Sequence, residues 1–325
     1  MPRRLSPREW IEKYLEPIQN QEIIQICLEA SPRRTELKYW TFLKLAALYS
    51  YAYYTYLPII GSKYRNPVYI DLFSGSGICG TDDINFIGSS ILMAVTESSR
   101  GFHFKKCIYV ESDSESATAL KKRLEKLDAE NILKCEDYKV IPKDCNDPEA
   151  LDEILNEIPS SQKHILLFVD PYCVEIKFST LKRFIDEPYL YFDMYLTFNF
   201  TGIARILGDA PNNPNKATIL TEFFGNDSWR NCIEEGSIRN CLRNLYPRRL
   251  KEEGGDKIKY VKAIEVKSGT SPFLYDLIFT TRKENSPWLM GIDRIKRMVE
   301  LCNGVAVRNT LDLPSLEVFD ENERN

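Results

Sequence analysis

Residues 67–80, Pro-Val-Tyr-Ile-Asp-Leu-Phe-Ser-Gly-Ser-Gly-Ile-Cys-Gly, decide the fold of this chain. Their first half is a short run of apolar, β-prone residues that starts after Pro67, which predicts one buried strand. Gly75, Gly77 and Gly80 then predict a turn in which the backbone approaches a ligand closely, because glycine has no Cβ. In open α/β sheets, ligands bind in the crevice at the carboxyl ends of the strands. The stretch therefore predicts an α/β fold with a ligand site at this turn.

The three glycines also match the G-x-G-x-x-G pattern of dinucleotide-binding folds, but this match alone is weak. A dinucleotide site needs the turn to run directly into a helix whose N-terminus faces the pyrophosphate. Here a polar loop follows Gly80, and its Asp82 and Asp83 would repel a pyrophosphate. The acid inside the strand, Asp71, suits a cationic ligand such as S-adenosylmethionine, which carries a sulfonium and an ammonium. An ordinary strand-to-helix turn with an incidental acid is the structural alternative.

Composition and charge limit the classes of protein to which this chain can belong. The chain has 325 residues, of which 43% are hydrophobic and 28% charged, enough for a sizeable core and an accessory segment. The net charge of −4 gives no general basic field for nucleic acid, although a local patch stays open. Nine scattered cysteines without a C-x-x-C pair, and only two histidines, argue against zinc and against a disulfide framework. Reduced thiols and the lack of a long apolar run predict a cytoplasmic protein.

Residues 7–60 show apolar spacing typical of helices, including one long pattern that starts at Thr35. We expect a helical segment over residues 1–60 packed on an α/β domain over 61–305, with an acidic tail over 306–325. The helical segment ends in a cluster of tyrosines at positions 51, 53, 54 and 56. Such a cluster could stack bases or line a groove, but it is more typical of a helix packed on a sheet.

A second strand is predicted over residues 106–111, and it ends in Glu111. An acid at this place in a nucleotide-binding sheet accepts hydrogen bonds from ribose hydroxyls. Ser112 and Glu115 have the spacing of a capping box, so a helix is expected to start here, and Glu111 could be only part of that cap.

A third strand is expected within residues 132–144, followed by Asp144 and Cys145. Asp144 is the first candidate to accept from the amino group of an adenine. Asp137 competes with it, and a simple surface loop is the alternative.

The fourth strand, residues 164–169, is a continuous apolar run, as expected for a central parallel strand. Asp170, Pro171 and Tyr172 follow it and would lie beside the glycine turn. Asp170 and the carbonyl of Pro171 could accept from the amino group of an acceptor, while Tyr172 stacks on its flat ring. A strand ending in turn-forming residues is the alternative. Cys173 invites comparison with a nucleophile, but a buried structural thiol fits better.

The rest of the chain completes a sheet. A fifth strand is predicted over residues 194–199, a hairpin over 259–266 and 273–281, and a final helix over 288–301. The hairpin makes the last strand antiparallel. Five cations precede it, at Arg239, Arg243, Arg248, Arg249 and Lys251. They could hold phosphates, but a solvated helical face is the more ordinary explanation.

With these motifs placed, the chain resembles the three-Cys-motif partner protein family over roughly residues 35–303. The resemblance rests on the first strand and on Gly88-Ser89, Asp144-Cys145-Asn146, Asp170-Pro171-Tyr172, Asn199-Phe200 with Arg205, and residues 274–279. It implies a class I methyltransferase fold, Rossmann-like, with a seven-stranded, mostly parallel sheet. It also implies a partner protein bearing three cysteines, itself similar to radical S-adenosylmethionine proteins. Asp170 is followed by one proline, whereas amino-group methyltransferases have two.

The sequence thus predicts a methyltransferase that uses S-adenosylmethionine, acts on an amino group of a nucleic-acid base (DNA or RNA), and needs no metal. The acceptor site is predicted at Asp170, Pro171 and Tyr172. The cofactor site is predicted at Asp71, Phe73, Ser74, Gly75, Gly77, Glu111, Ser112, Asp144 and Cys145. The alternatives are a catalytically silent module that binds the three-cysteine partner and a dinucleotide oxidoreductase.

Overall fold

A computed structural model describes most of the chain. It covers residues 6–36, 39–64, 66–80, 84–159, 164–234, 238–267, 274–283 and 287–301. The predicted acidic tail and the connection within the C-terminal hairpin lie outside these residues. Within the described ranges, each helix is too short or too polar to span a lipid bilayer.

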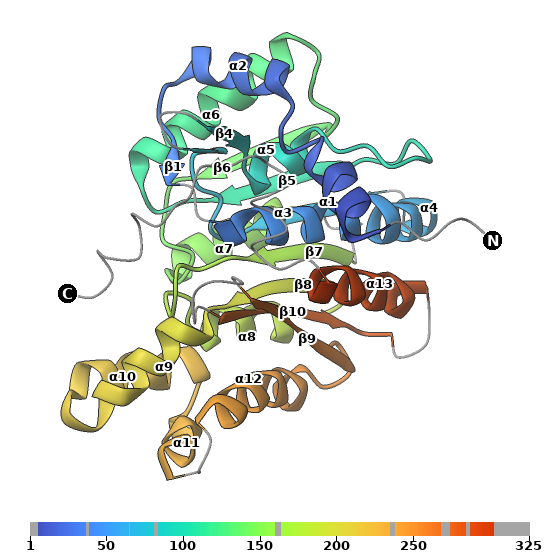
Figure 1. Cartoon of the computed structure of the whole chain (residues 1–325). Helices are drawn as coiled ribbons and strands as arrows, with labels where there is room; N and C mark the ends of the chain where they lie inside the picture. The colour runs from blue at the N-terminus through green and yellow to red at the C-terminus, as the bar shows by residue number, and fades with distance from the viewer. Residues whose placement is uncertain are drawn as a thin grey trace.

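The centre of the fold is a seven-stranded sheet in the order β6-β5-β2-β7-β8-β10-β9 (Figure 1). Its strands are β2 (Val68–Asp71), β5 (Lys106–Val110), β6 (Asp137–Ile141), β7 (His164–Val169), β8 (Tyr191–Phe198), β9 (Tyr260–Lys267) and β10 (Leu274–Thr281). The first five of these pair in parallel, whereas β10 runs antiparallel to both β8 and β9. This is the strand arrangement of class I methyltransferases, and it confirms the fold class predicted from the sequence.

Helices cover both faces of this sheet, and their bounds complete the element order. They are α1 (Pro7–Leu15), α2 (Gln21–Ala30), α3 (Tyr39–Tyr51), the π-helix η1 (Ala52–Gly61), α4 (Ser62–Tyr64), α5 (Ser89–Ala94), α6 (Ser114–Ala129), α7 (Pro148–Glu157), α8 (Phe178–Asp186), α9 (Phe200–Asp209), η2 (Ala210–Asn212), α10 (Pro214–Phe224), η3 (Asp227–Arg230), α11 (Asn231–Glu234), α12 (Ile238–Gly254) and α13 (Pro287–Leu301). Helices α9 to α12 gather at the end of the molecule where β9 forms the sheet edge (Figure 1).

Alternation along the central strand divides the core into two layers. Leu166 and Phe168 of β7 belong to the layer shared with α1, α2, α3 and α13. Ile165, Leu167 and Val169 belong to the layer shared with α7, α8, α9 and α12. A strand buried on both faces needs apolar residues at every position, which explains the unbroken apolar run.

A small three-stranded sheet lies next to the glycine turn and was not predicted. It joins β1 (Thr35–Glu36), β3 (Ile78–Gly80) and β4 (Asn85–Ile87), with β1 parallel to β3. The prediction of a helical pattern from Thr35 is therefore wrong at its start, because Thr35 and Glu36 pair with Cys79 and Gly80. The proposed domain boundary at residue 60 stays a prediction.

Two further expectations are corrected. Helix α6 is capped by Asp113, whose carboxylate accepts from the backbone N–H of Ser116 at 3.2 Å, so Ser112 is not the cap. Cys232 and Cys241 form a disulfide between α11 and α12, so the thiols are not all reduced as expected. Both differences depend on local geometry that residue spacing alone does not fix.

Asp193 gives the fold a pH dependence that can be measured. It lies in β8, is 1% exposed, and accepts from the Tyr51 hydroxyl at 2.8 Å. Burial raises the pKa of Asp193 to about 7. Between the ordinary carboxyl pKa and this value the folded protein keeps a proton that the unfolded chain has released. Its contribution to stability is therefore full at low pH and is lost as the pH rises through this window.

We expect Asp193→Asn to remove this pH-dependent contribution to stability. The unfolding free energy of the variant relative to wild type should rise with pH by up to about 1.4 kcal/mol per unit across the window. Urea unfolding at several pH values between acid and neutral measures it. Burial lowers the pKa of His164, whose Nε2 lies 3.7 Å from Asp193 Oδ1, to about 3, so the same comparison in a His164→Gln background separates its opposite contribution. Asp256→Asn, at a carboxylate that is 87% exposed, is the control. A difference between variant and wild type that does not change with pH would contradict this account of Asp193.

Candidate functional site

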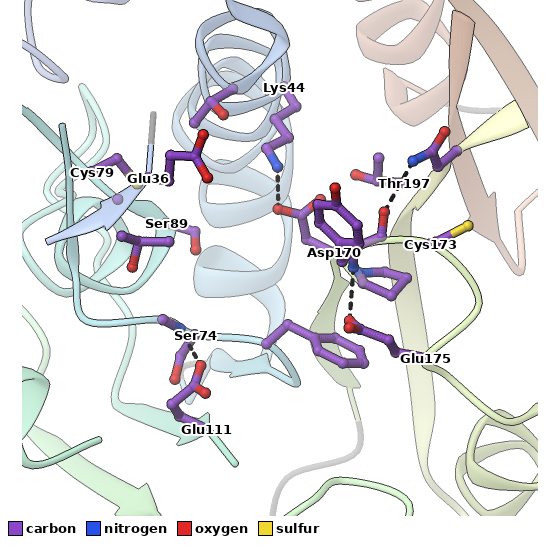
Figure 2. A pocket seen from close by; sticks show the side chains of 18 of the residues that line it. Glu36, Lys44, Ser74, Cys79, Ser89, Glu111, Asp170, Cys173, Glu175 and Thr197 are labelled. Carbon is purple, nitrogen blue, oxygen red and sulfur yellow. Dashed lines mark hydrogen bonds and ion pairs between the residues drawn. The ribbon is translucent and has the colours of Figure 1, made fainter. Parts of the chain in front are cut away.

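A cavity of about 620 Å³ opens at the carboxyl ends of β2, β5, β7 and β8 (Figure 2). This size lies within the range of small-molecule and cofactor sites. Of the predicted residues it is lined by Phe73, Ser74, Gly75, Gly77, Glu111, Ser112, Asp144, Asp170, Pro171 and Tyr172. The topology thus brings together motifs that are separated by up to a hundred residues in the chain.

The glycine turn forms one wall of the cavity. Gly75 and Gly77 both have left-handed backbones, with φ of +59° and +86°. A Cβ on Gly77 would lie 2.8 Å from Ile91 and 2.9 Å from Leu120, so no side chain fits there. The turn is fixed to the neighbouring strand by Ser74, whose N–H and hydroxyl both donate to the carbonyl of Val110 at 3.0 Å. The wall is therefore rigid, and it exposes backbone to the cavity.

Asp71 supports this wall from behind. It is fully buried and does not line the cavity, so its predicted direct contact with the cofactor is corrected. Its carboxylate accepts from the hydroxyls of Tyr69 at 3.0 Å and Ser89 at 2.7 Å, and from the N–H of Phe73 at 3.2 Å. Burial raises the pKa of Asp71 to about 7 in spite of these donors. Side chains along a strand alternate between its two faces, and this alternation places Asp71 beneath the turn.

Glu111 lies at the end of β5 with its carboxylate at the turn. One carboxylate oxygen accepts from the N–H of Gly75 and the other from the N–H of Asp113, both at 2.8 Å. Burial raises the pKa of Glu111. Each oxygen keeps a second lone pair for a ligand, so Glu111 can accept from two neighbouring hydroxyls. The alternative that Glu111 only caps α6 accounts for its contact with Asp113, but not for its contact with Gly75.

Asp144 and Asp137 are separated by the length of β6. Asp144 is exposed and lines the cavity, whereas Asp137 starts the strand and pairs with Lys106 at 2.9 Å. The structure thus leaves Asp144 as the candidate for a ligand. Cys145 is 2% exposed, belongs to the apolar core and does not line the cavity. Its predicted role in the cofactor site is corrected, because its side chain packs in the apolar core.

Asp170 faces the glycine turn from the opposite wall, and Lys44 of α3 forms an ion pair with it (Figure 2). Their side chains are only 16% and 13% exposed. Lys44 was not singled out from the sequence. The sequence nevertheless marks this residue, since Lys44 is the sole charged residue between positions 39 and 62. A lone cation in an apolar helix needs a partner, and only the tertiary structure supplies it.

Tyr172 stands at the mouth of the cavity and is 61% exposed. Its backbone is fixed on both sides: its N–H donates to Glu175 at 2.9 Å, and its carbonyl accepts from Asn199 at 3.0 Å. Cys173 is half-buried beside Gly202, where an added Cβ would lie 2.6 Å from its sulfur. Burial raises the pKa of Cys173 to about 11, which agrees with an inert structural thiol and not a nucleophile.

Two sets of residues considered for nucleic acid lie elsewhere. Tyr51 and Tyr56 are fully buried in the helical layer, and Tyr53 and Tyr54 pack edge to face beside them. None of the four lines the cavity. Four of the cations before the hairpin form ion pairs: Arg239 and Arg243 with Glu265, Arg248 with Glu252, and Arg249 with Glu253.

Known proteins resemble this chain only distantly. No protein-family model matches, and no curated protein matches. Among solved structures, an O-methyltransferase from Bacillus cereus in complex with SAH is 12% identical, with a TM-score of 0.40, covering 85% of this chain and 100% of that one. The plantazolicin methyltransferase BamL is 13% identical, with a TM-score of 0.36, covering 96% and 93%. A SAM-dependent methyltransferase from Anabaena variabilis is 12% identical, with a TM-score of 0.34, covering 86% and 96%. The fold class rests on the order and the direction of the strands in the central sheet.

Proposed function

We propose that this protein is an S-adenosylmethionine-dependent methyltransferase that acts on an amino group of a planar ring. The observation that carries the proposal is the arrangement around one cavity, in which Asp170 lies across from Ser74 of the glycine turn and from Glu111 (Figure 2), and Tyr172 lines the same cavity. Two halves of a site, one for a nucleoside and one for a flat acceptor, thereby open into the same space.

The size and the charge of the cavity support this cofactor. Its carboxylates are Glu36, Glu111, Asp144, Asp170 and Glu175 against the cations Lys44 and Arg205, so it favours a ligand with positive groups. Ser74, Gly75 and Gly77 would contact the ligand through backbone, and Phe73 and Ser112 would flank it. Glu111 would accept from the ribose hydroxyls and Asp144 from the adenine amino group. The bound cofactor would supply a methyl group on a sulfonium.

The acceptor half would work mainly by alignment. Asp170 would accept an N–H of the acceptor, which turns the nitrogen lone pair toward the methyl group. The N–C bond forms as the S–C bond breaks, and the product nitrogen then loses a proton to solvent. Tyr172 would stack on the ring, and the clamps from Glu175 and Asn199 would keep its backbone in place.

A base of DNA or RNA is the acceptor we propose, because it combines an amino group with a flat ring. Membership of the three-Cys-motif partner family, and with it a partner bearing three cysteines, belongs to the same proposal.

A catalytically silent module is the second candidate, and the Lys44–Asp170 ion pair favours it. A carboxylate that already pairs with a lysine of the chain accepts a hydrogen bond from an acceptor amine less readily. In that case the fold would bind S-adenosylmethionine and the partner without transferring a methyl group.

Calorimetry with S-adenosylmethionine tests the cofactor, and Glu111→Ala tests its site. We expect saturable binding to wild type that is weakened at least tenfold in the variant, since charge-assisted hydrogen bonds to the ribose are lost. Transfer of a labelled methyl group to mixed-sequence single-stranded DNA and RNA then separates the two candidates. An enzyme loses transfer in Asp170→Ala while its cofactor binding persists. Cofactor binding without any transfer by wild type would favour the silent module, and no cofactor binding by folded wild type would reject the methyltransferase and leave only a module that binds the partner.

A further inference from the structure

The chain before α3 crosses in front of the glycine turn and is tied to it. We call residues 31–36 the strap. The guanidinium of Arg123 from α6 is fully buried beneath it. It donates to the backbone carbonyls of Cys27, Ser31, Arg33 and Ser76. One buried cation therefore binds the strap and the turn together.

Two more contacts fix the strap, one to the glycine turn and one to the start of α6. The Thr35 hydroxyl accepts from the N–H of Ser76 at 3.2 Å, inside the glycine turn. Arg33 pairs with Asp113 at 2.5 Å and with Glu115 at the start of α6. Asp113 in turn donates its N–H to Glu111. The strap is thus fixed to the glycine turn and, through Asp113, to the segment that holds Glu111.

Glu36 is the last residue of the strap and lines the cavity. It pairs in register with Gly80, at the far end of the turn. No described residue forms an ion pair with its carboxylate. Figure 2 shows Glu36 and Glu111 at opposite ends of the turn wall, with Ser74 and Ser89 between them and Asp170 across the cavity.

We propose that Glu36 binds the ammonium group of the amino-acid arm of S-adenosylmethionine. The inference rests on the proposed function and assigns one end of that ligand. With the ribose at Glu111 and the sulfonium methyl directed at Asp170, the other end of the turn wall, at Ser89 and Glu36, receives the arm. A carboxylate opposite an ammonium makes a charge-assisted hydrogen bond, which is stronger than a neutral one. The strap then contributes a cofactor contact from outside the methyltransferase motifs.

Two thioethers test this assignment by calorimetry. S-adenosylhomocysteine and 5′-methylthioadenosine share adenosine and sulfur, but only the first has the amino-acid arm. Glu36→Gln keeps the shape of the side chain and removes its charge. We expect the variant to bind S-adenosylhomocysteine roughly tenfold more weakly and 5′-methylthioadenosine as wild type does. Glu22→Gln, an exposed acid of α2 away from the cavity, is the matched control and should change neither.

The other outcomes overturn the assignment in distinguishable ways. Equal weakening of both ligands would mean that Glu36 acts on the fold of the site and not on the arm. Unchanged binding of both would mean that Glu36 makes no contact, while the proposed function stands. Failure of folded wild type to bind either thioether would reject the proposed function itself. If Glu36→Gln does not fold, Glu36→Asp, which keeps the charge but withdraws it, should give a smaller loss confined to S-adenosylhomocysteine, and its absence would reject the assignment.

Discussion

Replacing Gly77 by alanine is expected to abolish S-adenosylmethionine binding and to lower the unfolding free energy by about 3 kcal/mol. Two costs add up: a left-handed backbone disfavours any Cβ by about 1–2 kcal/mol, and overpacking a filled site costs about 1–3 kcal/mol. The new Cβ would meet Ile91 and Leu120 at less than 3.0 Å, and the φ of Gly77 is +86°. The turn must move to relieve this contact, and it forms the wall of the cavity. Urea unfolding and calorimetry with S-adenosylmethionine measure the two effects.

Gly208→Ala is the matched control for this prediction. Gly208 lies in α9, and nothing lies within 4 Å of the Cβ it would gain. Alanine in a helix is favoured over glycine by roughly 0.5–1 kcal/mol, so this variant should be as stable as wild type or slightly more stable. Normal cofactor binding by Gly77→Ala at wild-type stability would show that the turn does not form the cofactor wall.

Replacing Arg123 by methionine is expected to have the second large effect. Methionine fills much of the same space but cannot donate a hydrogen bond, which leaves several buried carbonyls without their donor. Removing one partner from a buried, charged hydrogen-bond network costs about 3 kcal/mol or more. Burial lowers the pKa of Arg123 to about 10, so the guanidinium stays charged at neutral pH and the network is intact there. We therefore expect a loss of stability by urea unfolding over the whole neutral range.

Loosening of the strap should also weaken S-adenosylmethionine binding in Arg123→Met, because the strap carries Thr35 and Glu36 at the cavity. Lys126→Met is the control on the same helix. Lys126 is 42% exposed and pairs with Glu130, so its loss should change stability by less than about 0.5 kcal/mol. Wild-type stability in Arg123→Met would contradict the view that this buried cation joins strap and turn.

The sequence by itself determined the central strands and the edge of the sheet at which the cavity opens. An unbroken apolar run requires burial on both faces, so residues 164–169 had to be a central strand, and they form β7. Glycines after an apolar strand predict a turn, and acids at the ends of neighbouring parallel strands meet at one edge of the sheet. Glu111, Asp144 and Asp170 accordingly line one cavity. These features follow from local patterns repeated along the chain.

Only the tertiary structure decided which side chains reach the cavity and what surrounds them. Asp71 supports the turn from behind because the strand alternation directs it there, and Cys145 lies in the core. The strap, Lys44 and Arg123 come from segments whose local sequence resembles an ordinary helical layer. Their roles depend on long-range pairs, such as Lys44 with Asp170 and Arg123 with Ser76, and no local spacing encodes such pairs. A buried charge has to find its partner in space, so its partner becomes known only when the chain has folded.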